Sequence, residues 1–231
     1  MTDFELAAFN IRQEFLKNAE HKGCLYHLNA SFWRQTVDAG LRTLYINEDN
    51  EPHTVRTDIR RLMALPFVPL ADLEAAFDEV VEVMDDRVIP VWTYIENTYL
   101  RGHRPLRNRR RVPPRFPPQM WNVFESVLAE DERTNNPSES YNSKFQKLIV
   151  VHHANIWRFL DEVRSEEHDT HQLIQQINAG HVNVRPPPSK KYVACQNRLL
   201  RLARNYDAYK NRGEILRYLE AVSYNLHIQA D

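Results

Sequence analysis

Apolar positions recur at helical spacing along most of the chain. The first stripe predicts a helix over 3–19, and its apolar face comprises Phe4, Ala7, Ala8, Ile11 and Phe15. Later stripes of the same period predict helices over 31–39, 55–63, 73–84, 91–100, 139–151, 155–179, 191–211 and 214–227. Glycine readily adopts the left-handed conformation that ends a helix, and we expect such ends at Gly40, Gly180 and Gly213.

One short segment is interpreted differently. The run 22–28 reads Lys-Gly-Cys-Leu-Tyr-His-Leu and is mostly apolar after its glycine. A short apolar run next to a glycine is typical of a buried strand, so a strand is predicted here. Taken together, the pattern predicts a mainly α protein with few strands.

A basic segment interrupts the helical pattern. The span 101–118 holds seven arginines and five prolines, which excludes a regular helix and predicts an extended loop at an internal boundary. One interpretation is a solvated insertion. The other is contact with the phosphates of DNA, because guanidinium groups match phosphate oxygens. The candidate DNA-binding residues are Arg107, Arg109, Arg110, Arg111 and Arg115.

A second basic region lies near the C-terminus. Arg198, Arg201 and Arg204 recur every three residues and so share roughly one face of the predicted helix. The apolar residues expected to pack on the opposite face are Leu199, Leu202, Ala203 and Tyr206. The favoured interpretation is an ordinary amphipathic helix with a basic outer face, and binding of DNA or a protein partner is the alternative.

Composition and charge limit the class of protein. The chain has 231 residues, which is one large domain or two small ones, and its net charge of -1 excludes a uniformly basic nucleic-acid coat. Its two cysteines exclude a disulfide scaffold and a cysteine-rich zinc module. The apolar runs are too short for a membrane span, and the first residues do not resemble a signal peptide. An intracellular protein without a membrane partner is expected.

Cys24 and His27 form a Cys-x-x-His pair. A structural zinc site needs four ligands, and no second pair lies nearby in the sequence. We therefore favour a buried cysteine and a hydrogen-bonded histidine over a metal site.

An ordered set of short motifs resembles the Mutator-like element (MULE) transposase family. In chain order the motifs are Thr2-Asp-Phe-Glu5, Gly23-Cys-Leu-Tyr-His27, Phe32-Trp-Arg34 with Gly40-Leu41, Leu62-Met-Ala-Leu-Pro-Phe67, Trp121-Asn-Val123, and Arg133-Thr-Asn-Asn136 with Glu139. The resemblance covers nearly the whole chain. The order of the set is its specific feature, and the last motif is the most distinctive.

The resemblance implies an RNase H-like core that cleaves and transfers DNA strands with two divalent cations, Mg²⁺ or Mn²⁺, held by three carboxylates. By position, Asp3 matches the second catalytic aspartate and Glu139 the catalytic glutamate, and both would be metal ligands. The residues that would support this site are Cys24, His27, Asn135 and Asn136. DNA is the implied partner and the nucleus the implied location; a homo-oligomer is a further expectation, and a small-molecule substrate is not expected.

The same resemblance implies a division of the chain. Residues 1–30 would be a remnant of the catalytic core, and 31–118 a helical insertion that ends in the Arg/Pro-rich loop. Residues 119–153 would return to the core with the helix that bears the glutamate, and 154–231 would form a C-terminal helical region. The expected fold is therefore mainly α, with an incomplete RNase H-like core of few strands.

Two departures from the family change the expected activity. The first catalytic aspartate should lie upstream of Asp3, so only two of the three carboxylates are present. Tyr141-Asn142 stands where the family often has an aromatic residue followed by histidine. Two carboxylates do not hold two cations for in-line displacement, so we expect this chain alone to bind no metal tightly and to be inactive. A domesticated, non-enzymatic helical module that binds DNA or protein is the alternative, and a remnant without a selected role is a third interpretation.

Overall fold

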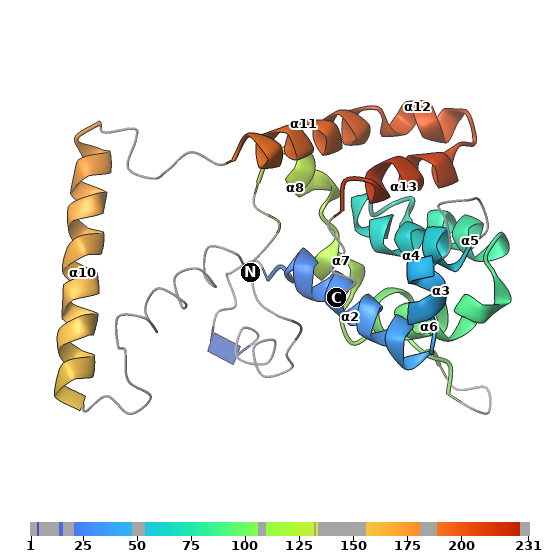
Figure 1. Ribbon diagram of the computed structural model, residues 1–231, viewed down its shortest axis with the longest axis horizontal. Helices are drawn as coiled ribbons and strands as arrows, with labels where there is room; N and C mark the ends of the chain where they lie inside the picture. The colour runs from blue at the N-terminus through green and yellow to red at the C-terminus, as the bar shows by residue number, and fades with distance from the viewer. Residues whose placement is uncertain are drawn as a thin grey trace. The chain divides into compact units, whose positions relative to one another are not determined.

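The computed structural model describes residues 4, 14–15, 21–47, 54–105, 110–131, 133, 156–180 and 189–226 (Figure 1). These residues are mainly helical, as predicted. The chain divides into two compact units, 1–135 together with 194–231, and 136–193. In the described ranges no strand forms, although His103 and Val112 make an isolated antiparallel bridge.

Helices build almost all of the first unit. They are α2 (Leu25–Asp38), α3 (Arg42–Asn47), α4 (Val55–Ala64), α5 (Leu73–Glu82), α6 (Ile89–Ile95), α7 (Pro118–Trp121), α8 (Phe124–Leu128), α12 (Tyr206–Asn211) and α13 (Ile215–Ser223). Short 3₁₀ turns η1 (Leu65–Phe67) and η2 (Asp86–Val88) and the π-turn η3 (Glu96–Leu100) connect them. The second unit contains α10 (Ile156–Asn178), and most of α11 (Lys190–Arg204) belongs to the first.

The predicted strand over 22–28 is wrong. Helix α2 begins at Leu25, directly after the extended residue Cys24, whose carbonyl accepts the amide of Leu28 at 3.0 Å. Leu25, Leu28 and Phe32 are all buried, and their spacing of three and four residues is that of a helix face. The seven-residue run was too short to show this period, which continues into the helix predicted over 31–39.

Most helix ends follow the local sequence. Gly40, Gly180 and Gly213 all have positive φ, and the helices preceding them end where predicted. The single helix predicted over 191–211 is instead interrupted at Asn205. The side-chain amide of Asn205 donates to the carbonyl of Arg201 at 2.9 Å, a local bond that competes with helix propagation. The helices predicted over 3–19 and 139–151 lie almost entirely outside the described residues.

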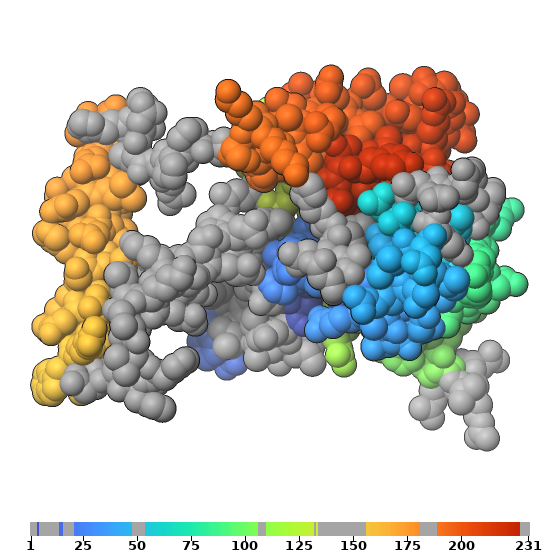
Figure 2. All heavy atoms as spheres, viewed as in Figure 1, coloured from blue at the N-terminus to red at the C-terminus, as the bar shows by residue number. Residues whose placement is uncertain are grey.

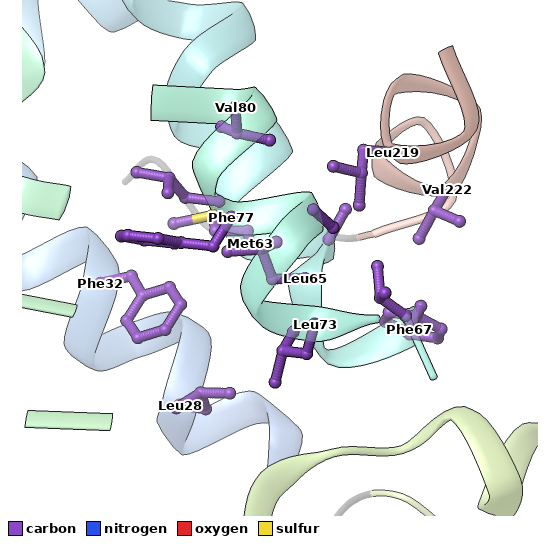
Figure 3. Close-up of a cluster of buried hydrophobic side chains, with 14 of the residues drawn as sticks. Leu28, Phe32, Met63, Leu65, Phe67, Leu73, Phe77, Val80, Leu219 and Val222 are labelled. Carbon is purple, nitrogen blue, oxygen red and sulfur yellow. The ribbon is translucent and has the colours of Figure 1, made fainter. Parts of the chain in front are cut away.

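The main core forms where the end of the chain packs back onto its first half. Figure 3 shows Leu219 and Val222 of α13 near the segment that carries Met63, Leu65 and Phe67. Helix α2 supplies Leu28 and Phe32 to the same core, and α5 supplies Leu73, Phe77 and Val80. All of these side chains are buried. Burial of apolar area is the main force that holds α13 on α4.

A buried ionic cluster also joins α4 to α13. Arg61 donates to Asp58 at 3.1 Å, and its Nε donates to Glu220 at 3.2 Å. The other oxygen of Asp58 accepts the amide of Asp85 at 3.0 Å, at the start of η2. Asp58 and Arg61 are both buried. The cluster therefore ties three segments that are distant in sequence.

Candidate functional site

Several of the predicted site residues fall outside the described ranges. Those residues are Asp3, Glu139, Asn135, Asn136, Arg107 and Arg109. The pairing of Asp3 with Glu139 and the metal site they would form therefore remain predictions.

Cys24 and His27 flank the start of α2. Cys24 is fully buried and reduced, as expected, and His27 is half-buried with its ring against Tyr26 at a centroid distance of 5.3 Å. Within the described part of the chain, no group of three or more His, Cys, Asp and Glu side chains is placed to hold a metal ion. The pair therefore has a structural position at a helix start.

Four of the short motifs meet in the first unit. The amide of Leu25 donates to the carbonyl of Arg133 at 3.0 Å, and the guanidinium of Arg133 lies over the ring of Phe67 at 5.9 Å. The Trp-Asn-Val motif closes onto the same segment, because the side chain of Asn122 donates to the carbonyl of Val68 at 2.7 Å. The amide of Val123 donates to a neighbouring carbonyl, that of Pro66, at 2.9 Å. Motifs far apart in sequence thus share one neighbourhood.

The first arginine of the basic loop is held by carboxylates. Arg101 pairs with Glu74 at 2.9 Å and with Asp78 at 2.7 Å, both on α5. Its hydrogen bonds to Asp78 lower the pKa of that carboxyl below its ordinary value. The acidic face of α5, which carries no basic residue of its own, is therefore compensated by the loop.

Arg111 also has partners within the chain. Its Nη2 lies 2.8 Å from Glu96, and its Nε donates to the carbonyl of Gly102 at 3.0 Å. Gly102 has a φ of 75°, and a β-carbon there would lie 1.9 Å from the carbonyl oxygen of Val112. Only glycine allows this approach. Both Arg110 and Arg111 are exposed, and Arg111 also fastens the base of the loop. DNA contact by either remains a prediction.

A cavity of about 960 Å³ opens between α2, α6 with η3, and the far side of the loop. The residues that line it are Phe4, His27, Ser31, Arg34, Tyr94, Asn97, Thr98, Tyr99, His103, Val112, Pro113, Arg115 and Phe116. No carboxylate is among these described residues. Arg115, the last arginine predicted to bind DNA, therefore faces a cavity together with Arg34 of α2.

One wall of this cavity is aromatic. The ring of Phe4 packs edge-on against Tyr99 and Phe116, at centroid distances of 5.5 and 5.1 Å. Gly23 allows this packing, because a β-carbon there would lie 2.4 Å from the ring of Phe4. The amide of Gly23 is held by the carbonyl of Met120 at 2.7 Å. The ring of Phe4 is thus packed between the aromatic pair Tyr99 and Phe116 and the backbone at Gly23.

Three hydroxyl groups lie in a row at the cavity. Tyr99 donates to Ser31 at 2.9 Å, and Ser31 shares a second hydrogen bond with Tyr94, also at 2.9 Å. Burial raises the pKa of Tyr99 above its ordinary range, so this residue remains a proton donor. No sequence motif pointed to this hydroxyl row, whereas Arg34, which also lines the cavity, lies in the Phe32-Trp-Arg34 motif.

A separate basic surface lies on α11. Arg198, Arg201 and Arg204, here called the arginine row, are exposed, while Leu199 and Ala203 are buried on the other side of the helix. The amphipathic helix predicted here is confirmed. Within the row, Arg198 donates to the amide oxygen of Asn225 and Arg204 lies 3.9 Å from an exposed glutamate, Glu130. Figure 2 shows the outer side of α11 uncovered in this view.

No helix in the described ranges combines the length and the apolar character needed to cross a membrane. Comparisons with known proteins find no matching family model, no matching curated protein and no matching solved structure.

Proposed function

We propose that this chain is a DNA-binding helical protein related to the C-terminal part of the Mutator-like transposases. The observation that carries DNA binding is the arginine row on α11, which is exposed and has little carboxylate compensation within the described residues. Guanidinium groups one turn apart on a helix can each contact a phosphate oxygen of the duplex. The row would therefore contact the backbone without reading base sequence.

Relation to this family is supported by the ordered motifs and by their placement. Backbone and side-chain hydrogen bonds connect residue 25 with 133 and segment 66–68 with 122–123, and these segments belong to or adjoin four of the motifs. Such convergence is expected when short motifs belong to one fold. An RNase H-like core that Asp3 and Glu139 help to form remains part of this proposal.

Strand cleavage is not proposed for this chain alone. In the family, Mg²⁺ or Mn²⁺ would activate the attacking oxygen and stabilise the leaving one. Asp3 and Glu139 are the residues of this chain that would bind such ions, and they supply two of the three carboxylates that the family uses. The activity proposed for the chain is DNA binding, with the nucleus as its location.

The test is the salt dependence of binding to duplex DNA, measured by fluorescence anisotropy. Replacing the three residues of the arginine row with glutamine should lower the slope of log K against log salt by about 2 to 3, because each phosphate contact contributes about 0.9. The matched control replaces three exposed arginines elsewhere, Arg42, Arg87 and Arg164, and so removes the same charge. Equal slopes for the two triple variants would contradict the proposal.

Protein binding is the alternative function. It is favoured by exposed apolar side chains of α10, among them Ile156 and Trp157, which are 60% and 74% exposed. If the wild-type chain shows no salt-dependent binding to DNA, this alternative becomes the better interpretation.

A further inference from the structure

The arginines of the first unit fall into two groups. One group forms ion pairs with carboxylates of the same unit and comprises Arg61, Arg101 and Arg111. Arg34 and Arg115 make no ion pair with the described residues, and both line the cavity described above. Two guanidinium groups without an ion pair among the described residues, at a cavity whose described lining holds no carboxylate, create a positive potential there. The cavity is thus suited to an anion.

The hydroxyl row of Ser31, Tyr94 and Tyr99 adds a hydrogen-bond donor to the positive charge of the two arginines. Three hydroxyls carry three protons, and the two hydrogen bonds within the row use two of them. Because Tyr99 donates to Ser31, the remaining proton belongs to Ser31 or Tyr94, both of which line the cavity. One O–H group is therefore available to an oxygen of a ligand. Phosphate oxygens accept hydrogen bonds from guanidinium and hydroxyl groups alike.

The size and the aromatic wall of the cavity indicate more than a bare phosphate. Its volume of about 960 Å³ lies within the range of cavities that hold small organic ligands. Aromatic rings in its lining, including Phe4 and Tyr94, offer faces or edges to a flat base. A nucleotide combines an anionic group, which suits the arginines, with a planar ring system, which suits the aromatic lining.

We propose that this cavity binds a nucleoside monophosphate, either free or at the end of a nucleic-acid strand. Arg34 and Arg115 bind the phosphate, the hydroxyl row donates one further hydrogen bond, and the aromatic lining contacts the base. The site is distinct from the arginine row, because none of the described residues that line the cavity belongs to α11. The proposal therefore does not depend on duplex binding by α11.

Isothermal titration of the full chain with dAMP, inorganic phosphate and deoxyadenosine tests this site. We expect dAMP to bind at least tenfold more tightly than either of the other two, since each supplies only part of the contacts. Absence of saturable binding at millimolar dAMP, or equal affinity for dAMP and deoxyadenosine, would overturn the proposal.

Variants locate the binding. Combining Arg34→Gln with Arg115→Gln should weaken dAMP binding about a hundredfold, because each removes a hydrogen bond to a charged group. The control combines Arg42→Gln with Arg164→Gln, which removes the same charge outside the cavity lining and should leave the affinity for dAMP unchanged. Equal losses in the two double variants would overturn the proposal by showing a non-specific charge effect.

Combining Ser31→Ala with Tyr94→Phe removes both hydroxyls that can hold the available proton, so we expect dAMP to bind at least about threefold more weakly. Unchanged affinity in this variant would contradict the hydroxyl contact. A single-stranded oligonucleotide with or without a 5′-phosphate identifies the source of the ligand. Phosphate-dependent binding that is tighter than that of dAMP indicates a strand end, and weaker binding indicates a free nucleotide.

Discussion

At the scale of single residues, charged side chains of this protein are distinguished by their partners rather than by their position in a charge run. Within the basic loop, Arg101 and Arg111 bind carboxylates of the same unit, whereas Arg115 faces a cavity without any among its described lining. All three belong to one run of arginines in the sequence. Arginines of one charge run therefore differ in role according to the burial and the ion-pair partners of each side chain.

Replacement of Arg61 should have a large effect on stability. Arg61→Gln removes the guanidinium that lies between the buried Asp58 and Glu220, and loss of one partner of a buried pair typically costs about 3–5 kcal/mol. Urea unfolding followed by circular dichroism measures this cost. A loss of less than about 1 kcal/mol would show that the cluster is well solvated in the folded protein.

The pair of Asp78 and Arg101 predicts a pH dependence of stability. Hydrogen bonds from Arg101 hold the pKa of Asp78 below its ordinary value of 3.8 in the folded protein. A carboxyl whose folded pKa is depressed stabilises the fold above its unfolded pKa, and this contribution disappears as the pH falls through the folded pKa. Asp78→Asn should therefore lower the thermal midpoint at pH 7, with a difference from wild type that vanishes in strong acid.

Glu79→Gln is the control for this prediction. It removes a charge from the same helix, and in the described residues Glu79 forms no ion pair with Arg101. Its effect on the thermal midpoint should be small at both pH values. A difference between Asp78→Asn and wild type that stays constant from pH 7 into strong acid would contradict the role of the Asp78 carboxylate.

At the scale of elements, a hydrogen bond of Tyr218 holds α13 on the first half of the chain, in addition to apolar packing and the ionic cluster around Arg61. The hydroxyl of Tyr218 donates to the carbonyl of Phe67 in η1 at 2.6 Å, and Tyr218 is fully buried. The two residues are separated by 151 positions in sequence. This bond therefore fixes how α13 is seated.

Tyr218→Phe should destabilise the protein by about 1–3 kcal/mol, because a buried carbonyl loses its donor. Tyr224→Phe provides the matched control, since Tyr224 lies next to the end of α13 and is 62% exposed, and it should cost less than about 0.5 kcal/mol. The difference in urea midpoint between the two variants measures the bond. Equal midpoints would show that water replaces the Tyr218 hydroxyl.

At the scale of the whole molecule, the activity expected of the chain is binding without cleavage. Purified protein should not nick supercoiled plasmid DNA in Mg²⁺ or Mn²⁺, because two matched carboxylates, Asp3 and Glu139, do not position two cations. The assay is agarose electrophoresis over a time course. Nicking that disappears in both Asp3→Ala and Glu139→Ala would contradict this expectation and indicate a complete metal site.

The apolar pattern and the glycines are sufficient to predict the helical character and most helix limits. Helix α10 lies where its apolar period predicts it, whereas α11 begins within one residue of its predicted start but ends at Arg204 instead of continuing to 211. Gly180 and Gly213 end helices as expected. These features depend on contacts between residues three or four positions apart, and on the backbone freedom of glycine, so a local pattern is sufficient to predict them.

Three features could be recognised only in the tertiary structure: the start of α2, the buried cluster around Arg61, and the cavity lined by Arg34 and Arg115. Each depends on groups that are far apart in sequence: Arg61 reaches Glu220, Leu25 reaches Arg133, and the cavity joins α2 to the loop. Such contacts form because packing of the apolar faces brings these segments together. The pattern of apolar residues along the chain predicts the helices. The partners of each buried charge and the lining of each cavity depend on how the helices pack.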